Sequence, residues 1–383
     1  MTRLLSDTQG IGWPGQRSAG VSGPRTGSGL RTGASRASLA TTAAEPATGL
    51  GWPAGRAGQA AVTQSLANGR HRSRLEASAS SGPVHAPPGP PIVADTPIAR
   101  AAGVAVEIRG GRGPAWPRPD SCRIIAVANQ KGGVGKTTTA VNLAVSLALH
   151  GAQVLVTDLD PQGNASTALD VEHRAGTPSI YNVLVEDQPL STIVRPVTGI
   201  PGLWCAPATI DLAGAEIELV PLVARESRLN RAIAGHDISA LDYILIDCPP
   251  SLGLLTVNSL VAGAEVLIPI QCEYYALEGL EQLLRTVELV QGHLNNDLVI
   301  STIVLTMYDA RTRLAAQVAE EVRSHFGPLV LNSVIPRSVR VSEAPSYGQS
   351  VITYDPGSPG ALAYLEAAEE MAKRNTSPAG TAG

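Results

Sequence analysis

The sequence predicts an α/β fold, a mostly parallel sheet with helices on both faces. From residue 123 onward, short runs rich in Val, Ile and Leu alternate with longer segments of helical periodicity. Such nearly continuous apolar runs are typical of parallel strands that are buried on both faces. A glycine-rich loop also joins the first apolar run to the first helical segment. In a sheet of this kind, ligand-binding residues are expected at the carboxyl ends of the strands.

Composition divides the chain into three parts. Residues 1–119 are rich in Gly, Ala, Ser, Pro and Arg without a sustained hydrophobic period, which predicts a low-complexity, disordered extension. Residues 120–374 are expected to form the α/β domain, and residues 375–383 a flexible tail. Charge follows a similar division. Residues 1–120 carry 13 Arg against 6 Asp and Glu, a net charge of +7, and the remainder carries −11, which together give the −4 of the whole chain.

The role of the extension is left open by its sequence. It is either a tail without a dedicated role or a basic arm that contacts DNA or a partner protein. Alternatively, translation begins nearer residue 120. That reading would require a start codon other than Met, because no methionine follows Met1 until Met307.

The four cysteines argue against a disulfide framework or a zinc site. They are widely separated and include no C-x-x-C pair, at Cys122, Cys205, Cys248 and Cys272. No uninterrupted apolar run reaches the ~18 residues of a membrane span, and the N-terminus lacks the apolar core of a signal peptide. The expected location is therefore the cytoplasm.

The glycine-rich loop has the context of a phosphate-binding loop. Residues 129–139 read Asn-Gln-Lys-Gly-Gly-Val-Gly-Lys-Thr-Thr-Thr, and they follow the predicted strand Arg123–Ala128. The three glycines let backbone N–H groups approach an anion, and the N-terminus of the next helix adds partial positive charge. Lys136 is expected to reach the β- and γ-phosphates, and the Thr137 hydroxyl to ligate Mg²⁺.

The loop departs from the usual G-x-x-x-x-G-K-[ST] pattern. Gln130 stands where the first glycine belongs, and Lys131 adds a second lysine in a chain whose only other lysine outside the loop is Lys373. This form resembles the deviant Walker A loop of the ParA/MinD ATPase family. The resemblance implies a P-loop NTPase and an ATP-sandwich homodimer, in which each Lys131 crosses to the partner's nucleotide. The ATP-binding residues that it implies in the loop are Lys131, Gly132, Gly133, Val134, Gly135, Lys136, Thr137 and Thr138.

Two carboxylates follow the next predicted strand, Gln153–Thr157, in the run Asp158-Leu-Asp160-Pro-Gln-Gly. Paired carboxylates at a strand end beside the phosphate loop suit the surroundings of a metal and an attacking water. The resemblance implies that Asp160 orients or activates the hydrolytic water and acts in catalysis with Lys131 and Lys136. It places Asp158 in the second shell of the magnesium. The other reading is an ordinary turn at a strand end.

A further hydrophobic strand, Tyr243–Asp247, ends in an acid. This is the Walker B arrangement, in which Asp247 holds Mg²⁺ through water beside Thr137. Alone the pattern is common, but together with the phosphate loop it is specific. Cys248 is expected to be a small buried hydrophobe rather than a catalytic thiol.

The remaining elements follow from apolar periodicity and from turn residues. Asp211 is expected to cap its helix. In chain order we expect helix Thr138–His150 ended by Gly151, helix Ser179–Val185, strand Leu203–Ala206, a helical stretch Asp211–Ala234, strand Glu265–Ile270, a helix to about Gly292, strand Val299–Thr306, a helix to Phe326, strand Leu329–Ile335 and a C-terminal helix Gly360–Lys373.

Two further segments resemble the chromosomal ParA/Soj branch: Gln271-Cys-Glu-Tyr-Tyr-Ala-Leu-Glu-Gly279, and Pro336-Arg-Ser-Val-Arg340 with the run that follows it. The resemblance implies that Pro336 packs near adenine, although many relatives have Asn where Ser338 stands. It also implies a basic surface that binds DNA without reading bases. Arg311 and Arg340 match that surface, and Arg313 and Arg337 lie close by in sequence. The other reading is four solvated surface arginines.

The C-terminal helix is acidic, through Glu366, Glu369 and Glu370. MinD-like proteins end instead in a basic amphipathic helix that lies on membrane, so no membrane contact is expected. The chain is identified as a ParA/Soj-type ATPase that uses ATP and Mg²⁺, with a ParB-type centromere-binding protein and nucleoid DNA as its expected partners. The alternative is a positioning ATPase of the same fold for a cytoplasmic protein cargo. The scattered cysteines argue against a reductase or metal-cluster relative.

Overall fold

The computed structural model describes residues 103, 106, 115–275 and 278–374. The extension and the tail, which were predicted to be disordered, lie outside the described residues except for residues 103, 106 and a short stretch that begins at Ala115. This stretch is attached to the domain: the Trp116 ring stacks on the His150 ring with 3.6 Å between centroids. The amide of Trp116 also donates to the His150 carbonyl at 3.1 Å.

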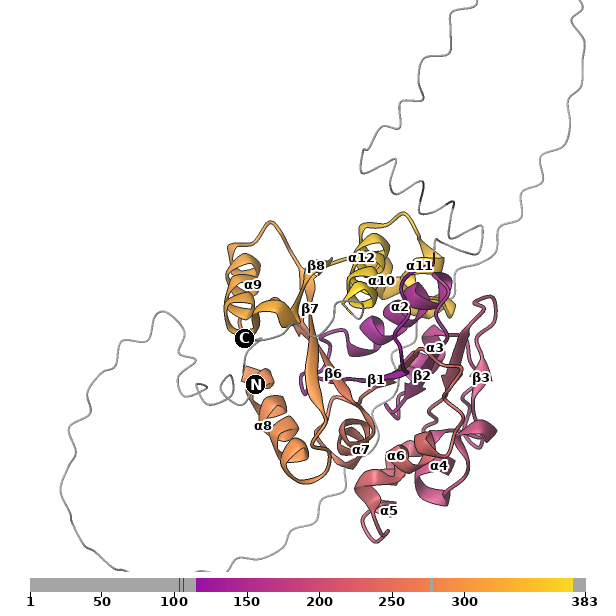
Figure 1. Ribbon diagram of the computed structural model, residues 1–383. Coiled ribbons are helices and arrows are strands. Elements are labelled where there is room, and N and C mark those ends of the chain that lie inside the picture. The colour runs from indigo at the N-terminus through magenta and orange to yellow at the C-terminus, as the bar shows by residue number, and fades with distance from the viewer. Residues whose placement is uncertain (1–102, 104–105, 107–114, 276–277, 375–383) are drawn as a thin grey trace, which may run out of the picture. The chain divides into compact units, whose positions relative to one another are not determined.

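The described residues contain one eight-stranded sheet with the order β3-β4-β2-β5-β1-β6-β7-β8 (Figure 1). All neighbours run parallel except β3, which is antiparallel to β4. The mostly parallel sheet predicted from the sequence is confirmed. The strands are β1 (Arg123–Val127), β2 (Val154–Asp158), β3 (Arg195–Pro196), β4 (Leu203–Ala206), β5 (Tyr243–Asp247), β6 (Glu265–Gln271), β7 (Val299–Tyr308) and β8 (Val330–Pro336).

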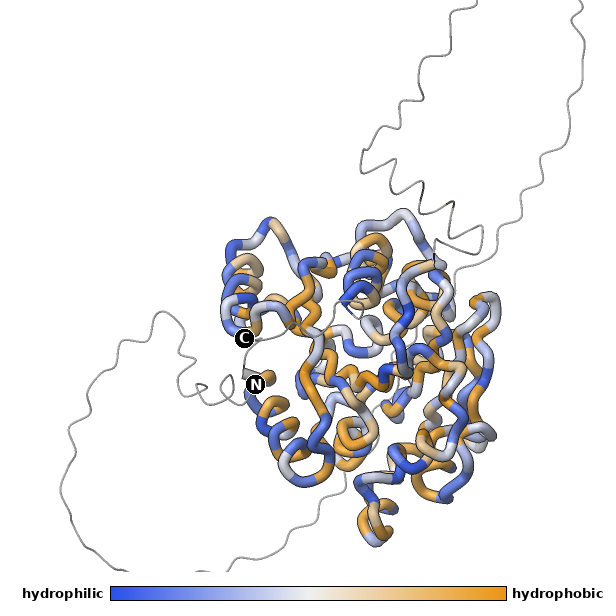
Figure 2. The backbone as a smooth tube through the Cα atoms, viewed as in Figure 1, coloured by the Kyte–Doolittle hydropathy of each residue, from blue (hydrophilic) through white to orange (hydrophobic). Residues whose placement is uncertain are grey.

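Helices cover both faces of the sheet, and alternate residues of one strand face opposite cores. In β5, Tyr243 and Leu245 pack with the helices at 136–149 and 359–373, whereas Ile244 and Ile246 pack with the four helices between 180 and 262. Hydrophobic residues accordingly dominate the central strands (Figure 2). The helices are α2 (Lys136–Leu149), α3 (Asn164–Ala168), α4 (Ile180–Glu186), α5 (Leu212–Glu218), α6 (Arg228–Ala234), α7 (Leu254–Ala262), α8 (Glu278–His293), α9 (Arg313–Phe326), α10 (Val339–Glu343), α11 (Val351–Tyr354) and α12 (Pro359–Lys373).

The predicted helical stretch Asp211–Ala234 is wrong in its middle. It forms two separate helices, α5 and α6, with turns and a short 3₁₀ segment between them. Pro221 lacks the N–H that a continuous helix needs, and Ala224 has a left-handed φ of 52°. Asp211 stands at the N-cap position of α5 without capping the helix. Its carboxylate instead accepts hydrogen bonds from Gly176 and Thr209.

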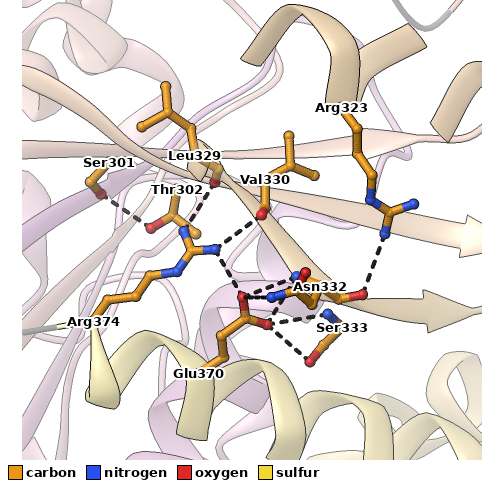
Figure 3. Close-up of polar contacts among 9 residues, drawn as sticks. All are labelled: Ser301, Thr302, Arg323, Leu329, Val330, Asn332, Ser333, Glu370 and Arg374. Carbon is orange, nitrogen blue, oxygen red and sulfur yellow. Dashed lines mark hydrogen bonds and ion pairs between the residues drawn. The ribbon is translucent and has the colours of Figure 1, made fainter. Parts of the chain in front are cut away.

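The edge strand β8 is fastened to α12 by the carboxylate of Glu370 (Figure 3). This carboxylate accepts hydrogen bonds from the backbone N–H groups of Asn332 at 3.0 Å and Ser333 at 3.2 Å. Arg374 donates to the same carboxylate at 2.8 Å and to the Val330 carbonyl at 3.0 Å. Backbone groups that an edge strand would leave unpaired are thereby satisfied. The predicted acidic helix is present, but the Glu370 carboxylate forms its hydrogen bonds with Asn332, Ser333 and Arg374 within the domain.

Partial burial of Glu370 raises its pKa, but the hydrogen bonds from Asn332, Ser333 and Arg374 outweigh that effect and leave its pKa below the usual value. Among the described helices, none has both the length and the apolar character needed to cross a membrane.

Candidate nucleotide-binding site

The glycine-rich loop lies at the carboxyl edge of the sheet, between β1 and the first residue of α2. Gly133 and Gly135 have φ values of 75° and 91°, a left-handed region in which a side chain is strained. No side chain caps the N-terminus of α2, and its first turn holds no acid. The loop and the helix therefore present free backbone N–H groups and a positive dipole end, which suit an anion such as phosphate.

Two neighbouring strands hold the loop in place. The Asn129 amide donates to the Pro269 carbonyl at 2.8 Å, while its side-chain oxygen accepts from the backbone N–H of Lys131 at 3.0 Å. The Thr306 hydroxyl donates to the Val134 carbonyl at 2.8 Å. Sequence reasoning missed both positioning residues. The place of Asn129 directly after β1 could have indicated its role, whereas nothing in the sequence relates Thr306 to the loop.

The two lysines of the loop lie in different environments. Lys136 is buried, and its Nζ donates to the Lys131 carbonyl at 3.3 Å. Burial lowers the pKa of Lys136, an effect that nearby Asp247 opposes. Lys131 keeps 31% of its side chain exposed, and its Nζ lies 3.5 Å from Oε2 of Glu273. Lys136 therefore points into the site, and Lys131 pairs with a carboxylate outside it.

Asp247 is the least satisfied polar group of the site. It is fully buried, and no hydrogen bond of ordinary geometry reaches either carboxylate oxygen from the part of the chain that the structure describes, although the Thr137 side chain lies close enough to act on it. Burial raises its pKa well above the usual value, and nearby Asp158 raises it further, while Thr137 and Lys136 act in the opposite direction. An unpaired buried carboxylate is costly, so this position fits a residue whose partner is a cation.

Asp158 lies directly opposite Asp247 across the β2–β5 pair but is satisfied. Its Oδ2 accepts from the backbone N–H and the hydroxyl of Ser166 at 2.8 and 2.7 Å, and its Oδ1 accepts from the Asp160 N–H at 3.1 Å. Burial raises the pKa of Asp158 to about 6 despite these bonds. Asp158 therefore positions α3 and the segment that carries Asp160.

A cavity of about 440 Å³ extends from the loop along α2. It is lined by the loop glycines, Lys136, Thr137, Thr138 and Asp160, and, from segments later in the chain, by Met307, Val341, Pro345 and the segment 349–351. Lys131, Asp247 and Pro336 do not belong to this lining. Pro336, which the resemblance placed near the adenine base, ends β8, and its contact with the base stays a prediction.

The four candidate DNA-binding arginines are all exposed. Arg311 and Arg313 follow β7, and Arg337 and Arg340 follow β8, so all four lie beyond the carboxyl ends of two neighbouring strands. Two of them are paired with carboxylates. Arg311 lies 2.9 Å from Asp309, whose pKa its hydrogen bonds lower to about 2. Arg340 lies 3.1 Å from Glu343 and 3.4 Å from Asp355.

Residues 122–300 match the model of a family described as an AAA domain. The chain is 56% identical over 250 residues to the sporulation initiation inhibitor protein Soj of Bacillus subtilis, covering 65% of this chain and 98% of Soj. It is 50% identical over 254 residues to the chromosome partitioning protein ParA of Caulobacter vibrioides, covering 66% of this chain and 94% of that protein.

Solved structures agree with the fold. Cobyrinic acid a,c-diamide synthase from Mycobacterium smegmatis, with a bound ATP analogue and magnesium, is 39% identical with a TM-score of 0.56, covering 65% of this chain and 93% of that one. MinD from Pyrococcus horikoshii, complexed with Mg-ADP, is 26% identical with a TM-score of 0.54, covering 67% and 98%. With nearly the whole of Soj matched at 56% identity, the chain belongs to the ParA/Soj family of chromosome-partitioning ATPases.

Proposed function

We propose that this chain binds ATP with Mg²⁺ and closes into a homodimer over two nucleotides. The dimer binds DNA and drives chromosome or plasmid segregation. The observation that carries the proposal is the buried Asp247 carboxylate, whose burial outweighs the effects of Thr137 and Lys136 within the described residues, at the same strand edge as the uncapped N-terminus of α2. An anion site and an unmatched buried carboxylate side by side are what a magnesium nucleotide requires.

Each residue of the site has a role in this proposal. The loop N–H groups and Lys136 hold the phosphates, Thr137 ligates the metal directly, and Asp247 does so through water. Bound Mg²⁺ neutralises charge on the β- and γ-phosphates. Asp160 is largely buried and lines the cavity together with Lys136 and Thr137, and in this proposal it orients the attacking water. The base lies against the apolar lining residues Val341 and Pro345, and Pro336 is a further proposed contact of the base.

Dimerisation is supported by the position of Lys131. Lys131 is not part of the cavity lining, and its ammonium pairs at 3.5 Å with the half-exposed carboxylate of Glu273, a contact that is weak in water. A second subunit that brings triphosphate to this face offers Lys131 a stronger partner. We propose that Lys131 exchanges Glu273 for the phosphates of the partner's nucleotide.

The names of the relatives support the cellular role, since several are chromosome partitioning proteins. We propose that the dimer uses Arg311, Arg313, Arg337 and Arg340 to bind nucleoid DNA in the cytoplasm, and that a ParB-type partner accelerates hydrolysis and so releases the DNA. Residues 120–374 are the proposed ATPase domain, and residues 1–119 an extension of it.

The test is DNA binding at several salt concentrations, with and without ATP, by wild type and Arg340→Glu. We expect binding only with ATP, with an affinity that falls steeply as salt rises because the contacts are to phosphate. Arg340→Glu should weaken binding while leaving the ATP-dependent dimer unchanged. Wild type that binds ATP and dimerises but has no affinity for DNA would contradict the DNA role and favour a protein cargo.

A further inference from the structure

The Asp160 carboxylate is fixed to the turn that follows it, residues 160–163. Its Oδ1 accepts a hydrogen bond from the Gln162 N–H at 3.0 Å, and the Asp160 carbonyl accepts one from the Gly163 N–H at 2.9 Å. Helix α3 begins directly after Gly163. The position of the carboxylate therefore depends on the position of this turn.

The end of the turn is closely packed on both His173 and the segment after β4. Gly163 has a left-handed φ of 62°, which favours glycine. A Cβ atom at Gly163 would lie 2.8 Å from Cδ2 of His173 and 3.2 Å from the Ala208 carbonyl oxygen. His173 is not among the residues that line the nucleotide cavity. It can therefore act on a bound nucleotide only through the turn and α3.

The His173 imidazole reaches the backbone of the turn through one hydroxyl group. Nε2 of His173 lies 3.1 Å from Oγ1 of Thr167. The same hydroxyl donates to the Gly163 carbonyl at 3.0 Å, and the Thr167 N–H donates to that carbonyl at 2.9 Å. Because a hydroxyl has only one hydrogen, a neutral imidazole with a bare Nε2 shares this hydrogen with the carbonyl. His173, Thr167 and Gly163 thus form one connected group.

The imidazole is itself held in place. Nδ1 of His173 lies 2.7 Å from the Val171 carbonyl, and because a carbonyl only accepts, Nδ1 carries a proton. The Val171 side chain is buried in the core. On the other side of His173 in sequence, the Gly176 N–H donates to the Asp211 carboxylate at 3.1 Å. A half-buried ring fixed in this way can support the turn beside it.

His173 complements a support that acts at the other end of the turn. Asp158 accepts hydrogen bonds from the Asp160 N–H and, in α3, from Ser166. These bonds fix the start of the turn and the middle of the helix. The contact of His173 falls between them, at Gly163.

We propose that His173 is a positioning residue for ATP hydrolysis. It holds Gly163 through the Thr167 hydroxyl and so keeps Asp160 where it orients the attacking water. The inference rests on the proposed function, in which Asp160 has that role. A small displacement of a positioning group slows the chemical step by a large factor, whereas the phosphates remain bound to Lys136 and to the loop N–H groups. Loss of the imidazole should therefore lower kcat and leave the affinity for ATP unchanged.

Hydrogen exchange of the full chain without nucleotide tests the contact itself. His173→Ala should speed exchange of the Gly163 and Thr167 amides about fivefold, the factor that corresponds to one ordinary hydrogen bond. Thr167→Val removes the hydroxyl, so the addition of His173→Ala to this variant should cause little further change. His236→Ala removes another half-buried histidine and should leave both amides unchanged.

Phosphate release and calorimetric ATP binding test the effect on the reaction. We expect His173→Ala to have a kcat about tenfold below that of wild type, with the Kd for ATP unchanged. Unchanged exchange, additive effects in the double variant, or a wild-type kcat would each overturn the proposal. Failure of the proposed function would be seen differently, as a wild type that releases no phosphate or as Asp160→Ala with the wild-type rate. Because the exchange experiment contains no ATP, its results would be unaffected.

Discussion

Replacement of Asp247 and of Asp158 by Asn should shift stability in opposite directions. Both carboxylates are fully buried and lie opposite each other across β2 and β5. No hydrogen bond of ordinary geometry reaches Asp247 within the described chain, and its burial outweighs the opposing effects of Thr137 and Lys136, so removal of its charge relieves a net burial cost. We expect Asp247→Asn to raise the free energy of unfolding by about 1–3 kcal/mol, the usual penalty of an unsatisfied buried group.

Asp158 receives three hydrogen bonds, two from Ser166 and one from the Asp160 N–H. An amide in its place turns an NH₂ group toward at least one of these donors. We expect Asp158→Asn to lower the free energy of unfolding by about 2–3 kcal/mol, because hydrogen bonds to a charged acceptor are lost and donors are left unpaired.

The assay is urea unfolding of the full chain with EDTA present and nucleotide absent, so that ligand binding does not stabilise the native state. The m-value should stay constant across wild type and both variants. Asp247→Asn should also lose Mg²⁺-dependent ATP binding. Functional residues often cost stability, so the substitution that stabilises the fold removes the carboxylate that holds the metal. If both variants shift stability in the same direction, the contrast between the two carboxylates is wrong.

Three further outcomes are expected. Lys136→Ala should abolish ATP binding measured by calorimetry, because its buried ammonium is the cation at the phosphate end; retained affinity would contradict the loop assignment. Asp160→Ala should trap an ATP-bound dimer with no phosphate release, and a variant that stays monomeric with ATP would count against its catalytic role. Glu370→Gln should lower the free energy of unfolding by about 1–3 kcal/mol, whereas Glu369→Gln, which loses an exposed pair with Lys373, should cost less than about 1 kcal/mol. The folded pKa of Glu370 is depressed below 4.5. Its contribution to the free energy of unfolding is therefore present above that pH and is lost as the pH falls through the folded pKa. The free energies of unfolding of wild type and Glu370→Gln, measured in a pH series, should converge in acid.

The sequence was sufficient for the seven parallel strands and for a glycine-rich loop that follows the first of them, but not for β3, the two-residue antiparallel strand. Each of these features is carried by a contiguous pattern: an apolar run for a strand such as Tyr243–Asp247, glycines for a left-handed turn, and a lysine at the start of a helix. Strand and helix bounds shift by a few residues where local pattern changes gradually. The break between α5 and α6 was also indicated locally, because Pro221 lies inside the stretch predicted as helical.

Contacts between distant segments could not be predicted. Thr306 holds the Val134 carbonyl from a strand 172 positions later, and Glu273 meets Lys131 across 142 positions. The cavity also takes the apolar lining residues Met307, Val341 and Pro345, which share no motif with the loop. These contacts depend on the order in which β6, β7 and β8 lie beside β1. No single segment of the sequence indicates that order.

The central claim is that Lys131 acts on the nucleotide of a second subunit while Lys136 holds that of its own. Light scattering of wild type and Lys131→Ala with saturating ATP and Mg²⁺ tests it most directly. We expect a dimer for wild type, and for Lys131→Ala a monomer that still binds ATP because Lys136 is intact. A Lys131→Ala protein that dimerises with ATP as readily as wild type would contradict the claim.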